Sequence, residues 1–184
     1  MPFAVAALLD EPSATHVQGL WALLEEHLDL RGIARTPIPH FSWQVAEDYD
    51  RDRLKAVLER WQRKLPIFTA RSSGLGFFAE PSPILFLPIV RDPRLTMIHR
   101  KLLPELDEAA ISPSTHYEPE NWVPHITLAA HDLTAEKAGQ AMQILSERPL
   151  LADIRIEAIG LIGPLERGVN DLGLHMRYGL EVAG

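Results

Sequence analysis

The feature that most constrains the fold of this chain is a pentapeptide that occurs twice. Residues 39–43 read Pro-His-Phe-Ser-Trp and residues 124–128 read Pro-His-Ile-Thr-Leu. Each copy has proline, histidine, an apolar residue, a hydroxyl residue and an apolar residue, which is the alternation typical of a β-strand. A motif at corresponding places in a chain indicates a structural unit used twice. We therefore expect a duplicated fold whose two motif strands face each other across a cleft.

The apolar spacing predicts a similar order of elements in both parts of the chain. After the first strand we expect a helix capped by Ser13 or Thr15 and ended by Gly32. Gly74 and Gly160 follow the two motif histidines at similar distances, and we expect both glycines in strands. Strands are expected at 3–9, 38–45, 67–79, 84–90, 123–129, 153–162 and 172–182, helices around 17–28, 54–61, 95–106 and 138–145, and a loop over 111–121.

These elements predict an α+β fold with two pseudo-symmetric β-sheet lobes, flanking helices and a central cleft. We expect residues 1–184 to form a single domain, with lobes at about 1–80 and 81–184. Helix starts are expected at Asp92 for the third helix and at Asp132 or Thr134 for the fourth. Trp43 and His99 lie at positions that predict core packing.

Composition limits the chemistry that this chain can perform. The 184 residues include 18 Lys plus Arg and 25 Asp plus Glu, a formal net charge of −7, which argues against binding long nucleic acid through its phosphates. No cysteine is present, so there is no thiolate nucleophile and no cysteine zinc site. We expect a cytoplasmic protein that contacts no membrane, because no apolar run approaches the ~20 residues of a membrane span and no signal-peptide pattern precedes Phe3.

The spacing within each motif places two reactive groups on one face of a strand. Residues i and i+2 lie about 6.6 Å apart on the same side, so His40 shares a face with Ser42, and His125 with Thr127. An imidazole can accept or donate a proton near neutral pH. Two imidazoles on opposite sides of a phosphorus atom could activate a nucleophile and protonate a leaving oxygen, while hydroxyls hold the other oxygens. This scheme needs no metal and no other cofactor.

The two His-x-(Ser/Thr)-x copies resemble the signatures of the 2H phosphoesterase superfamily, in particular its 2′-5′ RNA ligase-like and cyclic phosphodiesterase branch. The duplicated order and residues 121–128 (Asn-Trp-Val-Pro-His-Ile-Thr-Leu) extend the resemblance over nearly the whole chain. It implies a bilobal fold and metal-independent hydrolysis of 2′,3′-cyclic phosphates of nucleotides or RNA ends. It also implies that His40 and His125 are the catalytic acid/base pair and that Ser42 and Thr127 bind phosphate. Ser42 stands where many members have threonine.

The expected partner is a small cyclic nucleotide or the 2′,3′-cyclic phosphate end of an RNA, bound by a monomer. Tyr117, in the loop before the second motif, is a candidate for contacting the base or the phosphate. Three alternatives remain: a nucleotide-binding module with little turnover, a 2′-5′ RNA ligase, and a metal site on His40 and His125, for which no nearby third ligand is evident. Which histidine is the acid, and hence whether a 2′- or 3′-phosphate forms, does not follow from the sequence.

Overall fold

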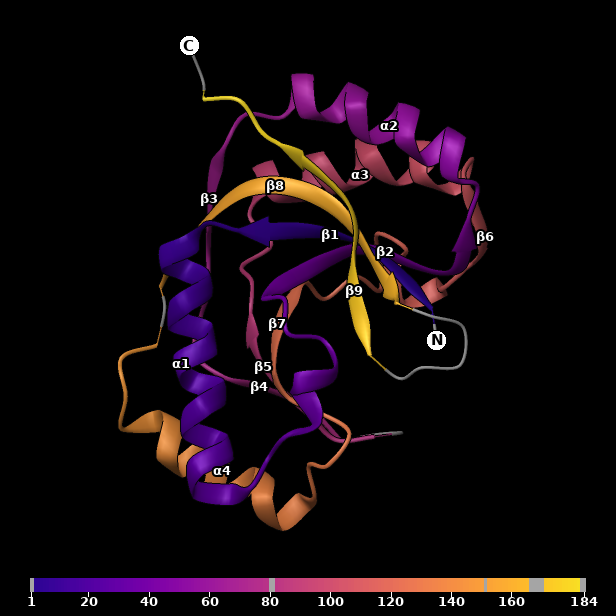
Figure 1. The fold of residues 1–184 in the computed structure, drawn as a ribbon. Helices are drawn as coiled ribbons and strands as arrows, with labels where there is room; N and C mark the ends of the chain where they lie inside the picture. Colours follow the sequence, from indigo (N-terminus) through magenta and orange to yellow (C-terminus); the bar gives the residue numbers. More distant parts are fainter. Residues whose placement is uncertain (1, 80–81, 151, 166–170, 183–184) are drawn as a thin grey trace.

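The computed structural model describes residues 2–79, 82–150, 152–165 and 171–182, and these form two antiparallel sheets (Figure 1). The larger sheet has the order β3-β8-β1-β2-β6, and β9 also pairs with β8; the smaller has the order β4-β5-β7. The larger sheet contains β1 (Phe3–Leu9), β2 (His40–Tyr49), β3 (Phe68–Arg71), β6 (Ala110–Pro113), β8 (Asp153–Pro164) and β9 (Leu172–Gly179), and the smaller contains β4 (Gly76–Phe78), β5 (Ile84–Pro88) and β7 (His125–Ala129).

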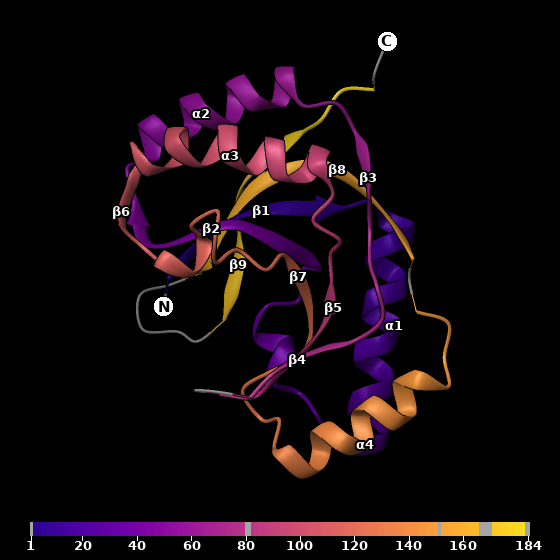
Figure 2. The same ribbon diagram turned by 180° about the vertical axis from the view of Figure 1, so that it is seen from behind.

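Each sheet is covered by one pair of helices. The helices are α1 (Glu11–Leu28), α2 (Arg51–Lys64), α3 (Pro93–Asp107) and α4 (Ala135–Ser146), and short 3-10 turns form η1 (Gly32–Arg35) and η2 (Thr115–Tyr117). Helices α2 and α3 lie together on the larger sheet, whereas α1 and α4 lie together beside the smaller one (Figures 1 and 2). Helix α1 therefore follows a strand of one sheet and packs against the other. None of the described helices is long and apolar enough to cross a membrane.

The predicted α+β class and order of elements are confirmed, with local corrections at the helix ends. Asp10, not Ser13 or Thr15, caps α1, because its carboxylate accepts from the Ser13 N–H at 3.0 Å. The helix ends at Asp29, which adopts the left-handed conformation with φ 52°, before Gly32 is reached. Asp92 caps α3 and Thr134 caps α4, as expected.

Two segments differ from the prediction between the helices. The expected loop at 111–121 begins with β6, which pairs with the far end of β2, and continues into η2. The expected strand at 67–79 is two strands, β3 and β4, which belong to different sheets. Gly74 lies in the bend between them with φ +71°, a conformation that glycine adopts without steric cost, whereas Gly160 lies within β8 as expected.

The lobes predicted at about 1–80 and 81–184 do not correspond to the two sheets. Strands β1, β2 and β3 share the larger sheet with β6, β8 and β9 from the second half of the chain. The reason is that β1 is buried along most of its length, so the peptide groups on both its edges need partners. Strand β2 supplies one edge and β8 the other.

A single cluster of buried apolar side chains takes members from both sheets and all four described helices. Phe41 and Trp43 contribute from β2, and Leu85 and Ile126 from β5 and β7. The expected core positions of Trp43 and His99 are confirmed, since each is only 1% exposed. This shared core holds the motif strands β2 and β7 beside each other.

Candidate active site

The two motif strands have the same local structure. In each copy the proline is buried, the histidine is partly exposed, the apolar residue is buried, the hydroxyl residue is partly exposed, and the next two residues are buried. The repeated burial results from a β-bulge at the same position in both strands. Trp43 is the unpaired extra residue between Ser42 and Gln44, and Leu128 is the unpaired extra residue after Thr127. The duplication therefore includes the backbone irregularity that follows each hydroxyl residue.

Both histidines are held in the same orientation by the main chain. The Nδ1 of His40 lies 2.6 Å from the carbonyl oxygen of Ile38, and the Nδ1 of His125 lies 2.7 Å from that of Val123. A carbonyl oxygen only accepts, so Nδ1 carries the proton and donates it in both rings. The Nε2 atom of each neutral ring then keeps its lone pair. Each carbonyl is two residues before its histidine, across the motif proline.

Burial lowers the pKa of both imidazoles below the ordinary value of 6.5. For His40, desolvation is the largest cause, the hydrogen bond to Ile38 opposes it, and the neighbouring His125 lowers the pKa further. For His125, desolvation again outweighs the hydrogen bond to Val123. Both rings are therefore neutral in the free protein at pH 7. The electrostatic effect of His125 on His40 indicates that the fold brings the two predicted histidines near each other.

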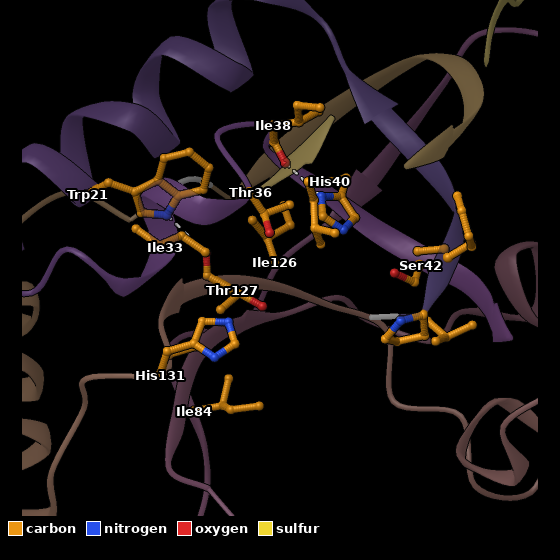
Figure 3. A pocket seen from close by; sticks show the side chains of 16 residues that line it. Trp21, Ile33, Thr36, Ile38, His40, Ser42, Ile84, Ile126, Thr127 and His131 are labelled. Carbon is orange, nitrogen blue, oxygen red and sulfur yellow. Dashed lines mark hydrogen bonds between the residues drawn. The ribbon is translucent and has the colours of Figure 1, made fainter. Parts of the chain in front are cut away.

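Three of the predicted site residues surround one hollow of about 220 Å³. Figure 3 shows His40 and Ser42 on β2 and Thr127 on β7 around the same space, with Ile38, Ile33 and His131 nearby. His125 does not line this hollow. Its ring packs instead against two aromatic rings of the smaller sheet, with centroid distances of 5.3 Å to Phe78 and 4.9 Å to Phe86.

The backbone of each hydroxyl residue is bound by a tryptophan from a distant part of the chain. The Nε1 of Trp21, on α1, donates to the Thr127 carbonyl oxygen at 2.9 Å, a bond drawn in Figure 3. The Nε1 of Trp122, just before β7, donates to the Ser42 carbonyl oxygen at 2.9 Å. Each motif is thus held by an indole of the other repeat unit. Sequence reasoning missed both roles, although Trp122 lies in the segment that carries the family resemblance.

Tyr117 lies beside the first motif, although it precedes the second motif in the sequence. Burial raises the pKa of its phenol, and the nearby Ser42 side chain opposes that rise. The phenol therefore stays protonated near neutral pH and can donate a hydrogen bond. Tyr117 is thus next to one of the predicted phosphate-binding hydroxyls.

Asp132 fixes η1, which forms one wall of the hollow. The sequence suggested Asp132 only as a possible start of the fourth helix. Asp132 accepts the backbone N–H groups of Arg31 at 2.6 Å and Gly32 at 2.7 Å, which are the residues that begin η1. A side chain at Gly32 would collide with the Ala130 carbonyl oxygen, so the close approach requires glycine. Within the described ranges, no three His, Asp or Glu side chains come together as metal ligands.

The sequence and the fold agree on one family. A family model described as the 2′-5′ RNA ligase superfamily matches residues 9–167, which include both motif strands and all four described helices. The chain belongs to the 2′-5′ RNA ligase superfamily. The resemblance to 2H phosphoesterases is thereby confirmed. The fold described above is the duplicated fold of that superfamily.

Comparison with solved structures finds a similar fold at low sequence identity. The structure of TT0787 from Thermus thermophilus covers 100% of both chains with a TM-score of 0.66 and 15% identity, which shows a similar fold. Two structures of Usb1 from Kluyveromyces marxianus, one with uridine monophosphate, each cover 97% of both chains with a TM-score of 0.47, at 9% and 11% identity. These two TM-scores are too low to establish a shared fold. Among curated protein sequences, none matches this chain.

Proposed function

We propose that this protein is a metal-independent phosphodiesterase that hydrolyses 2′,3′-cyclic phosphates of nucleotides or RNA ends. The observation that carries the proposal is the matched pair of imidazoles. His40 and His125 lie on neighbouring motif strands, each with Nδ1 bound to the carbonyl two residues earlier and Nε2 without a hydrogen bond to any described residue. A general base and a general acid need such an oriented nitrogen.

The proposed reaction is an in-line displacement at phosphorus. One histidine accepts a proton from water at Nε2 while the water oxygen forms a bond to phosphorus. The bond from phosphorus to one ribose oxygen breaks, and the other histidine, protonated at Nε2, donates its proton to that oxygen. The product is a nucleoside 2′- or 3′-monophosphate, depending on which histidine is the acid. The acid must be charged, and the anionic phosphate favours that form.

The hydroxyls are proposed to hold the phosphate during this step. Ser42 and Thr127 come from the two different strands and share the hollow with His40, so they can donate to the non-bridging oxygens. Tyr117 lies beside the first of them, Ser42. We propose that Tyr117 positions Ser42 and contacts the substrate from the same side.

The test is incubation of the protein with the four nucleoside 2′,3′-cyclic phosphates and with an oligonucleotide that ends in a cyclic phosphate. The position of the phosphate in each product identifies the ribose oxygen that leaves. Loss of either acid/base partner costs about 10²–10⁴-fold in rate, so His40→Ala and His125→Ala should each remove measurable turnover. His27→Ala is the matched control, because His27 is exposed on α1, and it should leave turnover unchanged.

Other outcomes would replace the proposal by a stated alternative. Tight calorimetric binding of a cyclic nucleotide that is recovered unchanged would indicate a binding module. A joined product from RNA termini would indicate 2′-5′ ligation, the reverse reaction. Turnover that EDTA abolishes and a divalent cation restores would contradict the metal-independent scheme. Circular dichroism of each variant separates loss of chemistry from loss of folding.

A further inference from the structure

Five exposed cations gather along α3 and the end of α2. We call this the α2–α3 basic surface, and it consists of Lys64, Arg91, Arg94, Arg100 and Lys101. Figure 2 shows the two helices side by side on the larger sheet. The whole chain has a formal net charge of −7, so this local excess of positive charge is opposite to the average. Net charge alone therefore conceals a surface on which anions can bind.

The α2–α3 basic surface is hollowed and not flat. One hollow of about 540 Å³ lies between α2 and α3, and a second of about 530 Å³ lies along the first part of α3. The two share Met97, Arg100 and Lys101 as lining residues. Met97 is 50% exposed and lies among the cations. The surface therefore offers apolar contact together with positive charge.

Most of these cations lack a carboxylate partner among the described residues. Glu105 is the one carboxylate among the described residues that line the two hollows, and it already contacts Arg60 at 2.6 Å and Lys64 at 3.9 Å. No ion pair is formed by Arg94, Arg100 or Lys101 within the described ranges. Their positive charge is thus left for an external anion.

The same surface has an excess of hydrogen-bond donors. The Nε1 of Trp61, which lines the larger hollow, is buried without a partner in the part of the chain that the structure describes. The guanidinium of Arg94 lies over the Phe68 ring, 5.5 Å from its centre, and forms no ion pair within the described ranges. Donors that outnumber acceptors suit an acceptor-rich, anionic ligand, of which phosphate is the simplest.

The spacing of the cations suits a chain of phosphates better than one anion. Arg94 and Lys101 are seven residues apart on α3, or about 10 Å along the helix axis. This length accommodates more than one phosphate of a nucleic-acid strand. Three of the five cations are arginines, whose planar donors match phosphate, and Met97 can contact an unstacked base.

We propose that the α2–α3 basic surface binds the phosphate backbone of single-stranded RNA, at a site separate from the paired histidines. The choice of RNA rests on the proposed function. The side chains of Phe41 and Trp43 pack into the core on the α3 side of β2, whereas His40 and Ser42 face the hollow on its other side. The surface would therefore bind the RNA strand away from its terminal cyclic phosphate, which reacts at the histidines. The net charge argues against long nucleic acid as a partner, and this proposal departs from that expectation on the strength of the local charge.

The test measures binding of a fluorescein-labelled oligouridylate that ends in a 3′-hydroxyl, by fluorescence anisotropy over a salt series. The variant Arg94→Gln/Arg100→Gln/Lys101→Gln should bind about tenfold more weakly, and its slope of log K against log salt should fall by about 2 in magnitude. The matched control is Lys55→Gln/Lys137→Gln/Arg148→Gln, which changes the net charge equally and should bind like the unmodified protein. Thermal melting checks that both variants fold.

Three results of the binding experiment would overturn the proposal. Equal binding by the α3 variant and the unmodified protein would exclude the surface, and equal weakening by both triple variants would indicate an effect of net charge. Competition by polyglutamate as strong as that by unlabelled RNA would indicate an acidic protein partner instead. Turnover of a nucleoside 2′,3′-cyclic phosphate is measured on the same samples and should be unchanged. Absence of that turnover in the unmodified protein would contradict the proposed function without affecting the RNA-binding result.

Discussion

At the scale of single residues, the two histidines are matched in hydrogen bonding as well as in sequence. Each donates Nδ1–H to a carbonyl two residues earlier, and each has a pKa lowered by burial. Two neutral rings with the same hydrogen bonds can each act as a base, so this geometry does not identify which one becomes the acid. The proposed reaction requires one ring to be protonated while the other is neutral.

The lowered pKa values predict an acidic optimum for catalysis. The form with one proton on the pair is most populated near the lowered pKa values, so kcat/KM should peak below pH 6.5 and fall as the pH rises toward 8, because the acid loses its proton. The measurement is the pH profile of kcat/KM for a nucleoside 2′,3′-cyclic phosphate. A maximum above pH 7.5 would be inconsistent with buried, neutral imidazoles in the free protein.

The indole hydrogen bonds predict a second residue-scale effect. Trp21→Phe and Trp122→Phe each keep an aromatic ring but leave a motif carbonyl without its donor. Each substitution should lower the free energy of unfolding by about 1–3 kcal/mol. Each should also lower kcat more than it raises KM. Trp61→Phe is the matched control, since its Nε1 has no hydrogen-bond partner among the described residues. Urea unfolding and steady-state kinetics give both quantities. An equal loss of kcat in Trp61→Phe would show that the indole bonds do not position the motifs.

At the scale of elements, each motif strand is preceded by a buried proline and contains a β-bulge after its hydroxyl residue. A residue before proline is restricted to extended conformations, which sets the direction of the Ile38 and Val123 carbonyls toward the imidazoles. The bulge shifts the alternation, so that two successive residues are buried in each strand. The strand therefore exposes its histidine and hydroxyl and then turns back into the core.

Loss of either motif proline should loosen its histidine. Pro39→Ala and Pro124→Ala free the backbone that orients the carbonyl acceptor, so kcat should fall by about tenfold with little change in KM, a part of what a general acid or base contributes. Pro149→Ala is the control, because Pro149 is exposed outside the motifs. A change confined to KM would place the effect on substrate binding and contradict the positioning role.

At the scale of the whole molecule, a stack of three aromatic rings joins the parts that carry the two motifs. Trp122, just before β7, lies 5.6 Å from Trp43 of β2 and 3.8 Å from His99 of α3, measured between ring centroids. His99 donates from Nε2 to the Trp43 carbonyl oxygen at 3.2 Å. Burial, helped by the charge of Arg91, lowers the pKa of His99 to about 4. The junction therefore requires a neutral histidine.

This junction predicts a loss of stability in mild acid. His99 has a pKa of about 4 in the folded protein and near 6.5 when unfolded, so its contribution is complete above pH 6.5 and is lost as the pH falls toward 4. Between pH 7 and pH 5 this loss amounts to about 2 kcal/mol. His99→Gln should be less stable at pH 7 but should lose about 2 kcal/mol less than the unmodified protein between those values.

The measurement is urea unfolding at the two pH values. His116→Gln, at an exposed position in η2, should keep the pH dependence of the unmodified protein. The other lowered histidines, His40 and His125, act in the same direction and remain in both variants. If the stability of His99→Gln depends on pH as steeply as that of the unmodified protein, protonation of His99 does not destabilise the fold.

Sequence alone was sufficient for features that depend on neighbours along the chain. It predicted most of the strands, the four helices, the core position of Trp43 and the start of α3 at Asp92. It also placed His40 and Ser42 on one face, and both line the same hollow. The repeated pentapeptide also predicted the family. Local steric and apolar patterns determine these features, because helix and strand periods are properties of a short segment.

Only the tertiary structure decided how distant segments meet. Trp21 and Thr127 are 106 positions apart, and Trp122 and Ser42 are 80 positions apart, so no local pattern could pair them. The bulges depend on the register with β1 and β5, and the division of the strands between two sheets depends on both edges of β1 being paired. The α2–α3 basic surface likewise exists only where two helices pack. Strand register, donor partners and surface charge are set by packing between segments, which composition and periodicity do not encode.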